Sequence, residues 1–381
     1  MDFKASSALH RVPLEIWTNI FLDCLPDRRF ITPNCVTAPL MLCNICRRWR
    51  AVARSTPKLW SSIHVEVSLG CDVKKVVKGV ALWLSRSGTR PLAISFTWNG
   101  NPQRARSYYL GQPLPHETDP FPWLQLCRFV TQTRSNTTWE EFLYILQRSP
   151  NITSGLFKIR SEAAPTPFLA APVVHEQLTD LDLSINAKSM SNLLEYVTLP
   201  ALHSFAIRGI DVFEFWPHGH FVAFLSRLRS PLQRLKLSDT LIGTSELIEI
   251  LCLTPALTNL YVEGWSSMFL GNEFFQALTL HEDNQEEYLH LCLRLETLTL
   301  CATFMSSDGV LADMVESQYN LDVQGFTKLR RVNVALTWDW VETCDHKRLE
   351  ALCGKGLVIF VQAHTGATAT AWDEDPGGGG I

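Results

Sequence analysis

The spacing of apolar residues divides the chain into stretches with different expected elements. Near the N-terminus, apolar residues recur every three or four positions after Pro13, which predicts a helix over about residues 13–25. Residues 26–39 contain three prolines and no sustained period, so a connecting loop is expected there. A second helix is predicted from Pro39 to about residue 54, with a buried stripe at Leu42, Ile45, Trp49 and Val52.

From residue 63 to about residue 150, patterns typical of strands alternate with patterns typical of helices. Alternation over 63–67 and 92–97 predicts strands, and residues 72–86 read as a helix that ends at Gly88. The stretch 98–122 is rich in Pro, Gly and Arg and has no period, so we expect a long loop. Thr137 with Glu140 predicts a capping box at the start of the next helix, which Ser149-Pro150 ends.

Beyond residue 175 one short apolar pattern, L-x-x-L-x-L with other apolar residues allowed, returns six times. Its copies are Leu178, Leu181, Leu183; Leu202, Phe205, Ile207; Leu232, Leu235, Leu237; Leu257, Leu260, Val262; Leu295, Leu298, Leu300; and Leu329, Val332, Val334. Helical segments over 191–197, 221–228 and 246–253 lie between copies. Each unit is therefore predicted to be a strand followed by a helix, and neighbouring units must cover each other's strands.

Together these elements predict an α/β chain with four parts. A small all-α module over 8–63 is followed by a linking α/β segment of degenerate repeats over 64–175. An irregular strand-helix repeat array follows over 176–364. Low complexity and four consecutive glycines predict a disordered tail over 365–381.

Charge and cysteine content narrow the range of partners. Lys and Arg number 34 against 38 Asp and Glu, a formal charge of -4, so no nucleic-acid partner is expected. No apolar stretch reaches membrane-span length and the N-terminus lacks a secretory pattern, which favours a cytoplasmic or nuclear protein without a membrane partner. The eleven cysteines are expected to be mostly reduced and buried, including Cys43 and Cys46, whose CxxC lacks a second half for zinc.

The N-terminal fragments carry a resemblance to a known family. VPLEIW (12–17), IF (20–21), ICRRWRAVA (45–53) and PKLW (57–60) occur in this order and together resemble the F-box pattern, in the F-box-like variety expanded in fungi. Val12, where leucine usually precedes the proline, and the long 26–39 connector depart from that pattern.

The resemblance implies a small helical fold that docks on the adaptor Skp1, which joins it to a cullin and a RING subunit. The contact residues that it implies are Pro13, Leu14, Glu15, Ile16, Ile20 and Phe21, with Trp49 and Trp60 shaping the helical core beside them. The alternative interpretation is that all of these residues form the core of one larger domain.

The repeats resemble the leucine-rich repeats that often follow F-boxes. The asparagine expected three residues after the last apolar position occurs only as Asn186, so an irregular curved solenoid is favoured over a regular one. Positions between the apolar ones would project from the concave sheet and could bind a protein target. Candidates are Asp180, Asp182, His203, Arg234, Lys236, Asn259, Tyr261 and Arg330; an ordinary solvated face, or loop anchors at Trp216, Trp265, Trp338 and Trp340, are the alternatives.

Signatures of catalysis are missing from the sequence. It contains no G-x-S-x-G, Walker loop, G-x-G-x-x-G or H-E-x-x-H motif, so we predict no enzyme, no metal and no cofactor. His218-Gly219-His220 is interpreted as a loop, and Asp339, Glu342, Asp345 and His346 as a solvated helix start. The leading hypothesis is a substrate receptor of an SCF-type ubiquitin ligase; an interaction scaffold outside ubiquitin ligation and a hydrolase with an unrecognised site are the rivals.

Overall fold

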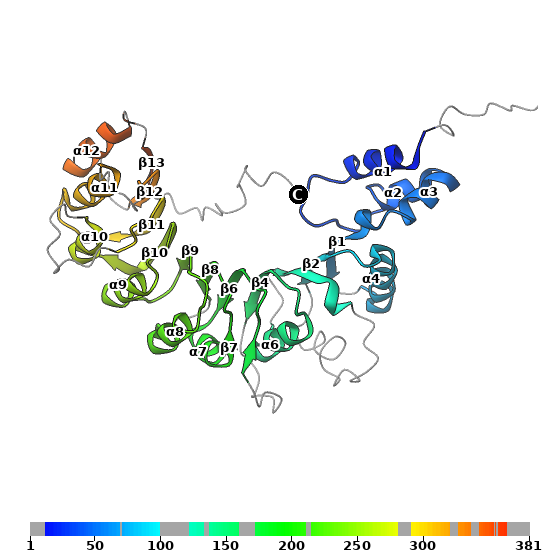
Figure 1. The fold of residues 1–381 in the computed structure, drawn as a ribbon, viewed down its shortest axis with the longest axis horizontal. Coiled ribbons are helices and arrows are strands. Elements are labelled where there is room, and N and C mark those ends of the chain that lie inside the picture. Colours follow the sequence, from blue (N-terminus) through cyan, green and yellow to red (C-terminus); the bar gives the residue numbers. More distant parts are fainter. Residues whose placement is uncertain are drawn as a thin grey trace, which may run out of the picture. The chain divides into compact units, whose positions relative to one another are not determined.

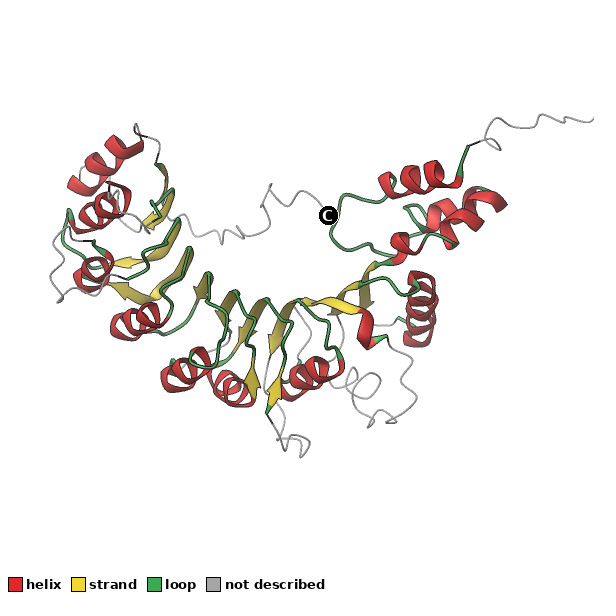
Figure 2. Ribbon diagram, viewed as in Figure 1, coloured by secondary structure: helices red, strands yellow, loops and turns green. Residues whose placement is uncertain are grey.

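The computed structural model describes residues 12–68, 71–99, 122–132, 137–159, 172–210, 215–280, 291–320, 327–336, 343–353, 355 and 357–363 (Figure 1). These residues form a mixed α/β protein with eleven α-helices and a parallel sheet of eleven strands that does not close into a barrel (Figure 2). The strand order is β1-β2-β3-β4-β6-β8-β9-β10-β11-β12-β13, and β5 and β7 pair separately. The mixed α/β class predicted from the sequence is therefore confirmed. The chain packs as two compact units, Met1–Leu232 and Gln233–Ile381.

The first unit begins with short helices. They are α1 (Leu14–Asp23), α2 (Leu40–Ile45), α3 (Arg47–Arg54) and the 3-10 turn η2 (Pro57–Trp60). The first predicted helix and the loop after it are confirmed. The single helix predicted from Pro39 is wrong, because Cys46 has φ -156° and ψ 169° and its extended backbone separates α2 from α3. As a result Ile45 leaves the predicted buried stripe and is 51% exposed.

Strands and helices then alternate through the rest of the first unit. The elements are β1 (Ser62–Ser68), α4 (Val73–Ser87), β2 (Leu92–Asn99), η4 (Trp123–Gln125), β3 (Leu126–Gln132), α6 (Trp139–Arg148), β4 (Ser154–Ile159), β5 (Val173–Val174), β6 (Asp180–Ile185), α7 (Ala187–Tyr196), β7 (Val197–Thr198), β8 (Ser204–Gly209) and α8 (His218–Leu225). The predicted strands near 63 and 92 and the helix near 72 are confirmed. Strands β3 and β4 were not predicted. Most of the predicted 98–122 loop and the 365–381 tail lie outside the described residues.

One local prediction in this unit is corrected, and one residue of the repeat pattern has a capping role. The capping box pairs Thr138 with Glu141, one residue after the predicted pair, because Thr138 is the residue whose hydroxyl accepts from the N–H of Glu141. Asn186, the single asparagine of the repeat pattern, is the N-cap of α7. Its side chain caps α7 by accepting from the N–H of Ser189 at 2.9 Å.

The second unit continues the alternation. Its elements are β9 (Arg234–Ser238), α9 (Thr244–Leu253), β10 (Asn259–Leu270), α10 (Asn272–Leu278), β11 (Thr297–Phe304), α11 (Val310–Asn320), β12 (Arg331–Leu336), α12 (Cys344–Cys353) and β13 (Val358–Ala363). All six copies of the apolar pattern lead into or lie within strands, namely β6, β8, β9, β10, β11 and β12. The strand-then-helix order predicted for the copies is thus confirmed where the structure describes it.

In each unit, helices that connect successive strands cover one face of the sheet. In the first unit α6, α7 and α8 lie on the same side of β4, β6 and β8, and in the second α9, α10 and α11 lie on one side of β9 to β12 (Figure 1). All three apolar positions of every copy are at most 3% exposed. Burial alternates along β4 and β6, so the leucine positions face the helices and the intervening positions face away from them.

Cysteine burial differs from the expectation. All eleven cysteines are free thiols, but only Cys43 and Cys292 are buried, and six are exposed. Several of the exposed ones stand at helix ends, where a small side chain does not reach the core; Cys46, for example, caps α3.

Candidate functional site

The exposed surface of α1 carries large apolar side chains. Leu14, Ile16 and Ile20 are 54%, 48% and 42% exposed, and Pro13 and Glu15 are exposed beside them. Ile16 and Ile20 are one helical turn apart and so share one side of the helix. Exposed apolar residues grouped on one short helix are typical of a protein-binding surface.

An aromatic cluster fixes the orientation of α1. Trp17 and Phe21 lie 5.8 Å apart between ring centroids, and Trp49 of α3 lies 5.3 Å and 5.1 Å from them. Phe21 is fully buried, so the structure places it in this core and not on the surface with Ile16 and Ile20. Of the implied contact residues, Phe21 could thus affect a partner only by holding α1 in place.

Trp60 connects the N-terminal helices to the first strand-helix pair. Its ring is fully buried, its indole N–H donates to the carbonyl of Ala53 at 2.8 Å, and its ring meets Trp83 of α4 edge-on at 4.9 Å. The guanidinium of Arg86 lies 4.5 Å from the ring centroid of Trp60. Trp60 therefore packs η2 against α4.

In the first unit the predicted face residues do not all come together. Asp180 and Asp182 of β6 stand beside Ser204 and Ala206 of β8 in the register. His203 precedes β8, and its Nδ1 lies 2.6 Å from the carbonyl oxygen of Ala201, so its ring is held in the turn. The two aspartates share the open face, while His203 belongs to the connection.

In the second unit the register brings four predicted residues together. Arg234 stands opposite Asn259, and Lys236 opposite Tyr261. The Lys236 ammonium lies 4.4 Å from the Tyr261 ring centroid, close enough for a cation-π contact. Tyr261 is only 8% exposed, so its ring is less accessible than predicted.

Glu263 and Cys301 lie beside Tyr261 on this part of the face. The Tyr261 hydroxyl donates to the Glu263 carboxylate at 3.1 Å. Burial, and then the charge of Glu263, raise the pKa of the adjacent Cys301 thiol to about 11, so this thiol is protonated at neutral pH and is a poor nucleophile. Arg330 lies one residue before β12 and pairs with Glu296 at 3.7 Å.

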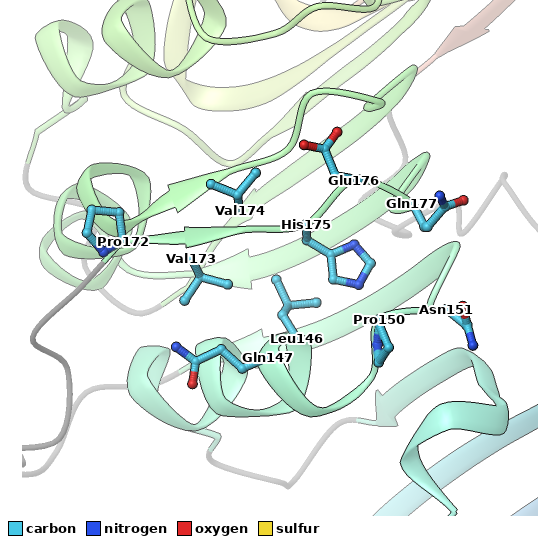
Figure 3. Close-up of a pocket in the computed structure, with 10 residues that line it drawn as sticks. All are labelled: Leu146, Gln147, Pro150, Asn151, Pro172, Val173, Val174, His175, Glu176 and Gln177. Carbon is cyan, nitrogen blue, oxygen red and sulfur yellow. The ribbon is translucent and has the colours of Figure 1, made fainter.

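A pocket lies between the C-terminal end of α6 and β5 (Figure 3). His175 is its most distinctive residue and is 3% exposed. Its Nε2 donates to the carbonyl of Ser149 at 2.9 Å, and its Nδ1 accepts from the N–H of Leu178 at 3.2 Å. Because both ring nitrogens hold backbone groups, His175 stabilises the turn and has no nitrogen left for proton transfer.

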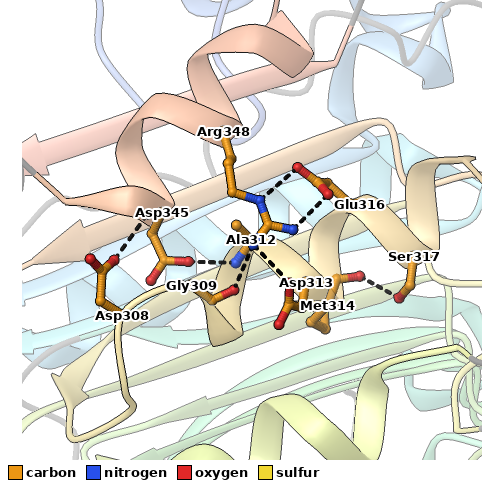
Figure 4. A network of polar contacts seen from close by, with 9 residues as sticks. All are labelled: Asp308, Gly309, Ala312, Asp313, Met314, Glu316, Ser317, Asp345 and Arg348. Carbon is orange, nitrogen blue, oxygen red and sulfur yellow. Dashed lines mark hydrogen bonds and ion pairs between the residues drawn. The ribbon is translucent and has the colours of Figure 1, made fainter.

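The polar residues near 345 form reciprocal helix caps. The Asp308 carboxylate accepts from the N–H groups of Cys344 and Asp345 at the start of α12, and the Asp345 carboxylate accepts from the N–H of Ala312 in α11 (Figure 4). Arg348 of α12 then pairs with Asp313 and Glu316 of α11, at 2.7 Å to each. Asp345 is therefore a capping residue.

Among the residues that the structure describes, the remaining candidates for chemistry do not assemble a site. Asp339 and Glu342 lie outside the described residues, as do Trp338 and Trp340 and the side chain of Trp265. Trp216 packs on Phe221 at 5.0 Å and is 6% exposed, so it is a core residue and not a loop anchor. No three His, Cys, Asp or Glu side chains of the described part are placed to hold a metal ion.

In comparisons with known proteins, no family model and no curated protein matches the chain. None of the described helices combines the length and the apolar character needed to cross a membrane.

Proposed function

We propose that this protein is the substrate receptor of an SCF-type ubiquitin ligase. Its F-box-like helices, α1 to α3 with η2, bind Skp1 and through it a cullin, and its leucine-rich-repeat solenoid holds a protein target. Its contribution is proximity between target and ligase, so the chain itself carries out no bond chemistry.

The exposed apolar side of α1 is the observation that carries the proposal. Ile16 and Ile20 are 48% and 42% exposed although the aromatic core of Trp17, Phe21 and Trp49 lies directly beneath the same helix. Burying the exposed isoleucines against a partner favours binding by about 25 cal/mol for each Å² of apolar surface removed from water. Both residues belong to the segment that resembles the F-box pattern.

The second part of the proposal rests on the sheet. Eleven parallel strands present one face to helices in each unit, and the open face carries polar and charged side chains such as Asp182 and Arg234. A protein target bound there would be held next to the ligase that Skp1 recruits.

Co-purification with Skp1 tests the proposal. The wild-type chain is expected to co-purify with tagged Skp1. For the double variant Ile16→Asp/Ile20→Asp, the amount that co-purifies is expected to fall by at least 90%, a loss of binding free energy of about 1.4 kcal/mol or more, because the new charges would be buried unpaired. Folding should be unchanged by circular dichroism, since both side chains are nearly half exposed.

The matched control is Val77→Asp/Leu82→Asp on α4. These two apolar side chains are 45% and 57% exposed and lie outside the F-box-like segment, so this variant is expected to keep Skp1. A wild-type chain that does not bind Skp1, or a double variant on α1 that binds it fully, would overturn the proposal and favour an interaction scaffold outside ubiquitin ligation.

A further inference from the structure

One row of residues crosses the open face of the second unit. Strand pairing places Arg234, Asn259, Thr297, Arg331 and Val358 side by side on β9 to β13. The next row, toward the strands' C-terminal ends, ends at Phe360, which stands beside Asn333. The sequence pattern had not predicted β13, so the apolar end of these rows became visible only in the structure.

Charge and polarity vary along the row in a definite order. Arg234 and Arg331 are both exposed, and the residues between them, Asn259 and Thr297, are neutral hydrogen-bonding groups. None of the five residues of the row is acidic. Elsewhere in this unit, Glu263 accepts from Tyr261 and Glu296 pairs with Arg330.

The far end of the row is apolar and open. Val358 is 43% exposed and Phe360 is 58% exposed, and both stand on the same face as Arg331. A ligand that follows the row thus meets an arginine, two neutral polar residues, a second arginine and then an apolar patch.

The strand spacing fixes the dimensions of such a ligand. Three strand intervals of roughly 4.8 Å place the Arg234 and Arg331 backbones about 14 Å apart, and one further interval reaches Val358. An extended peptide advances about 3.4 Å per residue and turns alternate side chains the same way, so positions 1, 5 and 7 of a peptide would face the first arginine, the second arginine and the apolar patch.

We propose that this row binds an extended segment of the target protein with acidic residues at positions 1 and 5 and a large apolar residue at position 7. The two arginines pair with carboxylates, Asn259 and Thr297 contact the peptide between them, and Val358 with Phe360 receives the apolar side chain. This inference rests on the proposed function, because it names the chemistry of the target that the receptor would hold.

Peptide binding to the full chain tests the proposal directly. The probe is the capped, fluorescein-labelled peptide Asp-Ala-Ser-Ala-Asp-Ala-Phe, followed by fluorescence anisotropy at low salt. It is expected to bind at least about fivefold more tightly than the peptide with both Asp replaced by Asn, and than a peptide with the acids at positions 1 and 3. Replacing Phe by Ser should also weaken binding, because the apolar contact is lost.

Charge reversal on the protein provides the matched comparison. Arg234→Glu and Arg331→Glu are each expected to lower the affinity for the probe peptide at least about fivefold. Arg330→Glu changes the charge by the same amount one residue away. Because Arg330 lies outside the row and pairs with Glu296, this variant should lower the affinity for the probe peptide by less than about twofold.

Several outcomes would overturn the proposal. Equal binding of the acidic and amide peptides, or equal losses in Arg330→Glu and Arg331→Glu, would mean that no defined row recognises the acids. Binding only when phosphoserine replaces both Asp would reject the carboxylate assignment in favour of phosphate. Skp1 co-purification, measured on the same preparations, reports separately on the proposed ligase function.

Discussion

Asp308 and Asp345 show how neighbours give one residue type two different roles. The N–H groups of Cys344 and Asp345 hold the pKa of Asp308 below its ordinary value of 3.8. Burial raises the pKa of Asp345, although the N–H of Ala312 acts in the opposite direction. The charged form is therefore favoured at Asp308 and disfavoured at Asp345.

These opposite shifts predict effects of different size for two isosteric variants. Asp308→Asn is expected to lower the urea midpoint at pH 7, because an amide has one acceptor oxygen for the two N–H groups that the carboxylate receives. Asp345→Asn should lower the midpoint less, because it also loses one of the acceptors for the N–H groups of Ala312 and Gly309 but removes the cost of burying a charge. Equal decreases in both variants would contradict this account.

The pH dependence of the Asp308 effect follows from its lowered pKa. Stabilisation by this carboxylate is fully present above about 3.8, its ordinary value, and is lost as pH falls through the lower folded value. The difference in midpoint between wild type and Asp308→Asn should therefore persist from pH 7 to about pH 4 and shrink at lower pH. Urea titrations at several pH values measure it.

Residue types and order were enough to select the exposed isoleucines of α1, but not to separate them from Phe21. The spacing places Phe21 on the same helix as Ile16 and Ile20, and all three are apolar. Only the position of Trp49, 5.1 Å from Phe21, decides which of them is covered.

At the scale of elements, the break between α2 and α3 is the clearest departure from the pattern. Apolar spacing continues across residue 46, so the sequence predicted one helix. The structure ends α2 at Ile45 and lets the Cys46 sulfur accept from the N–H of Trp49 at 3.4 Å, which starts α3 with a capped N-terminus. A cap of this kind satisfies a backbone group that would otherwise lack a helical partner.

Cap variants test the importance of this break. Cys46→Ala is expected to lower the free energy of unfolding by about 0.5–2 kcal/mol, because it removes the acceptor, whereas Cys46→Ser should be at least as stable as wild type. Urea unfolding followed by circular dichroism under reducing conditions measures both. If the alanine variant is as stable as the serine variant, the sulfur does not act as a cap.

The strands that the sequence pattern did not predict, β3, β4 and β13, were not recognisable for a common physical reason. β3 and β13 lack the repeated L-x-x-L-x-L spacing, and β4 contains a glycine at position 155. Their pairing partners are distant in the sequence, as in Ser154 with Asp180, so short local windows carry little information about them. Six of the eight predicted strands were recognisable because the same spacing recurs, and β1 and β2 because apolar residues alternate within them.

At the scale of the whole molecule, two functions are proposed on different elements of one chain. The adaptor surface lies on α1, and the acidic-peptide row lies on β9 to β13. Proximity labelling with the full chain should separate them.

Ile16→Asp/Ile20→Asp is expected to remove Skp1 and cullin from the labelled proteins while target labelling persists. Arg331→Glu should lower target labelling and keep Skp1, because Arg331 lies on β12 in the second unit, whereas α1 belongs to the first. Val77→Asp/Leu82→Asp should change neither. If either variant, still folded, loses labelling of both Skp1 and the target, the two surfaces do not act independently.

The sequence by itself determined the mixed α/β class, the first helix, eight of the strands and the buried leucine positions in six of them, because these depend on local periodicity and on the removal of apolar side chains from water. It also supplied the order of fragments that resembles an F-box. Only the tertiary structure decided which apolar residues of α1 stay exposed, that His175 and Asp345 hold backbone groups, and that Arg234, Arg331 and Val358 form one row. Those facts depend on pairing between residues far apart in the chain, and the register of such pairs follows from the packing of the whole sheet.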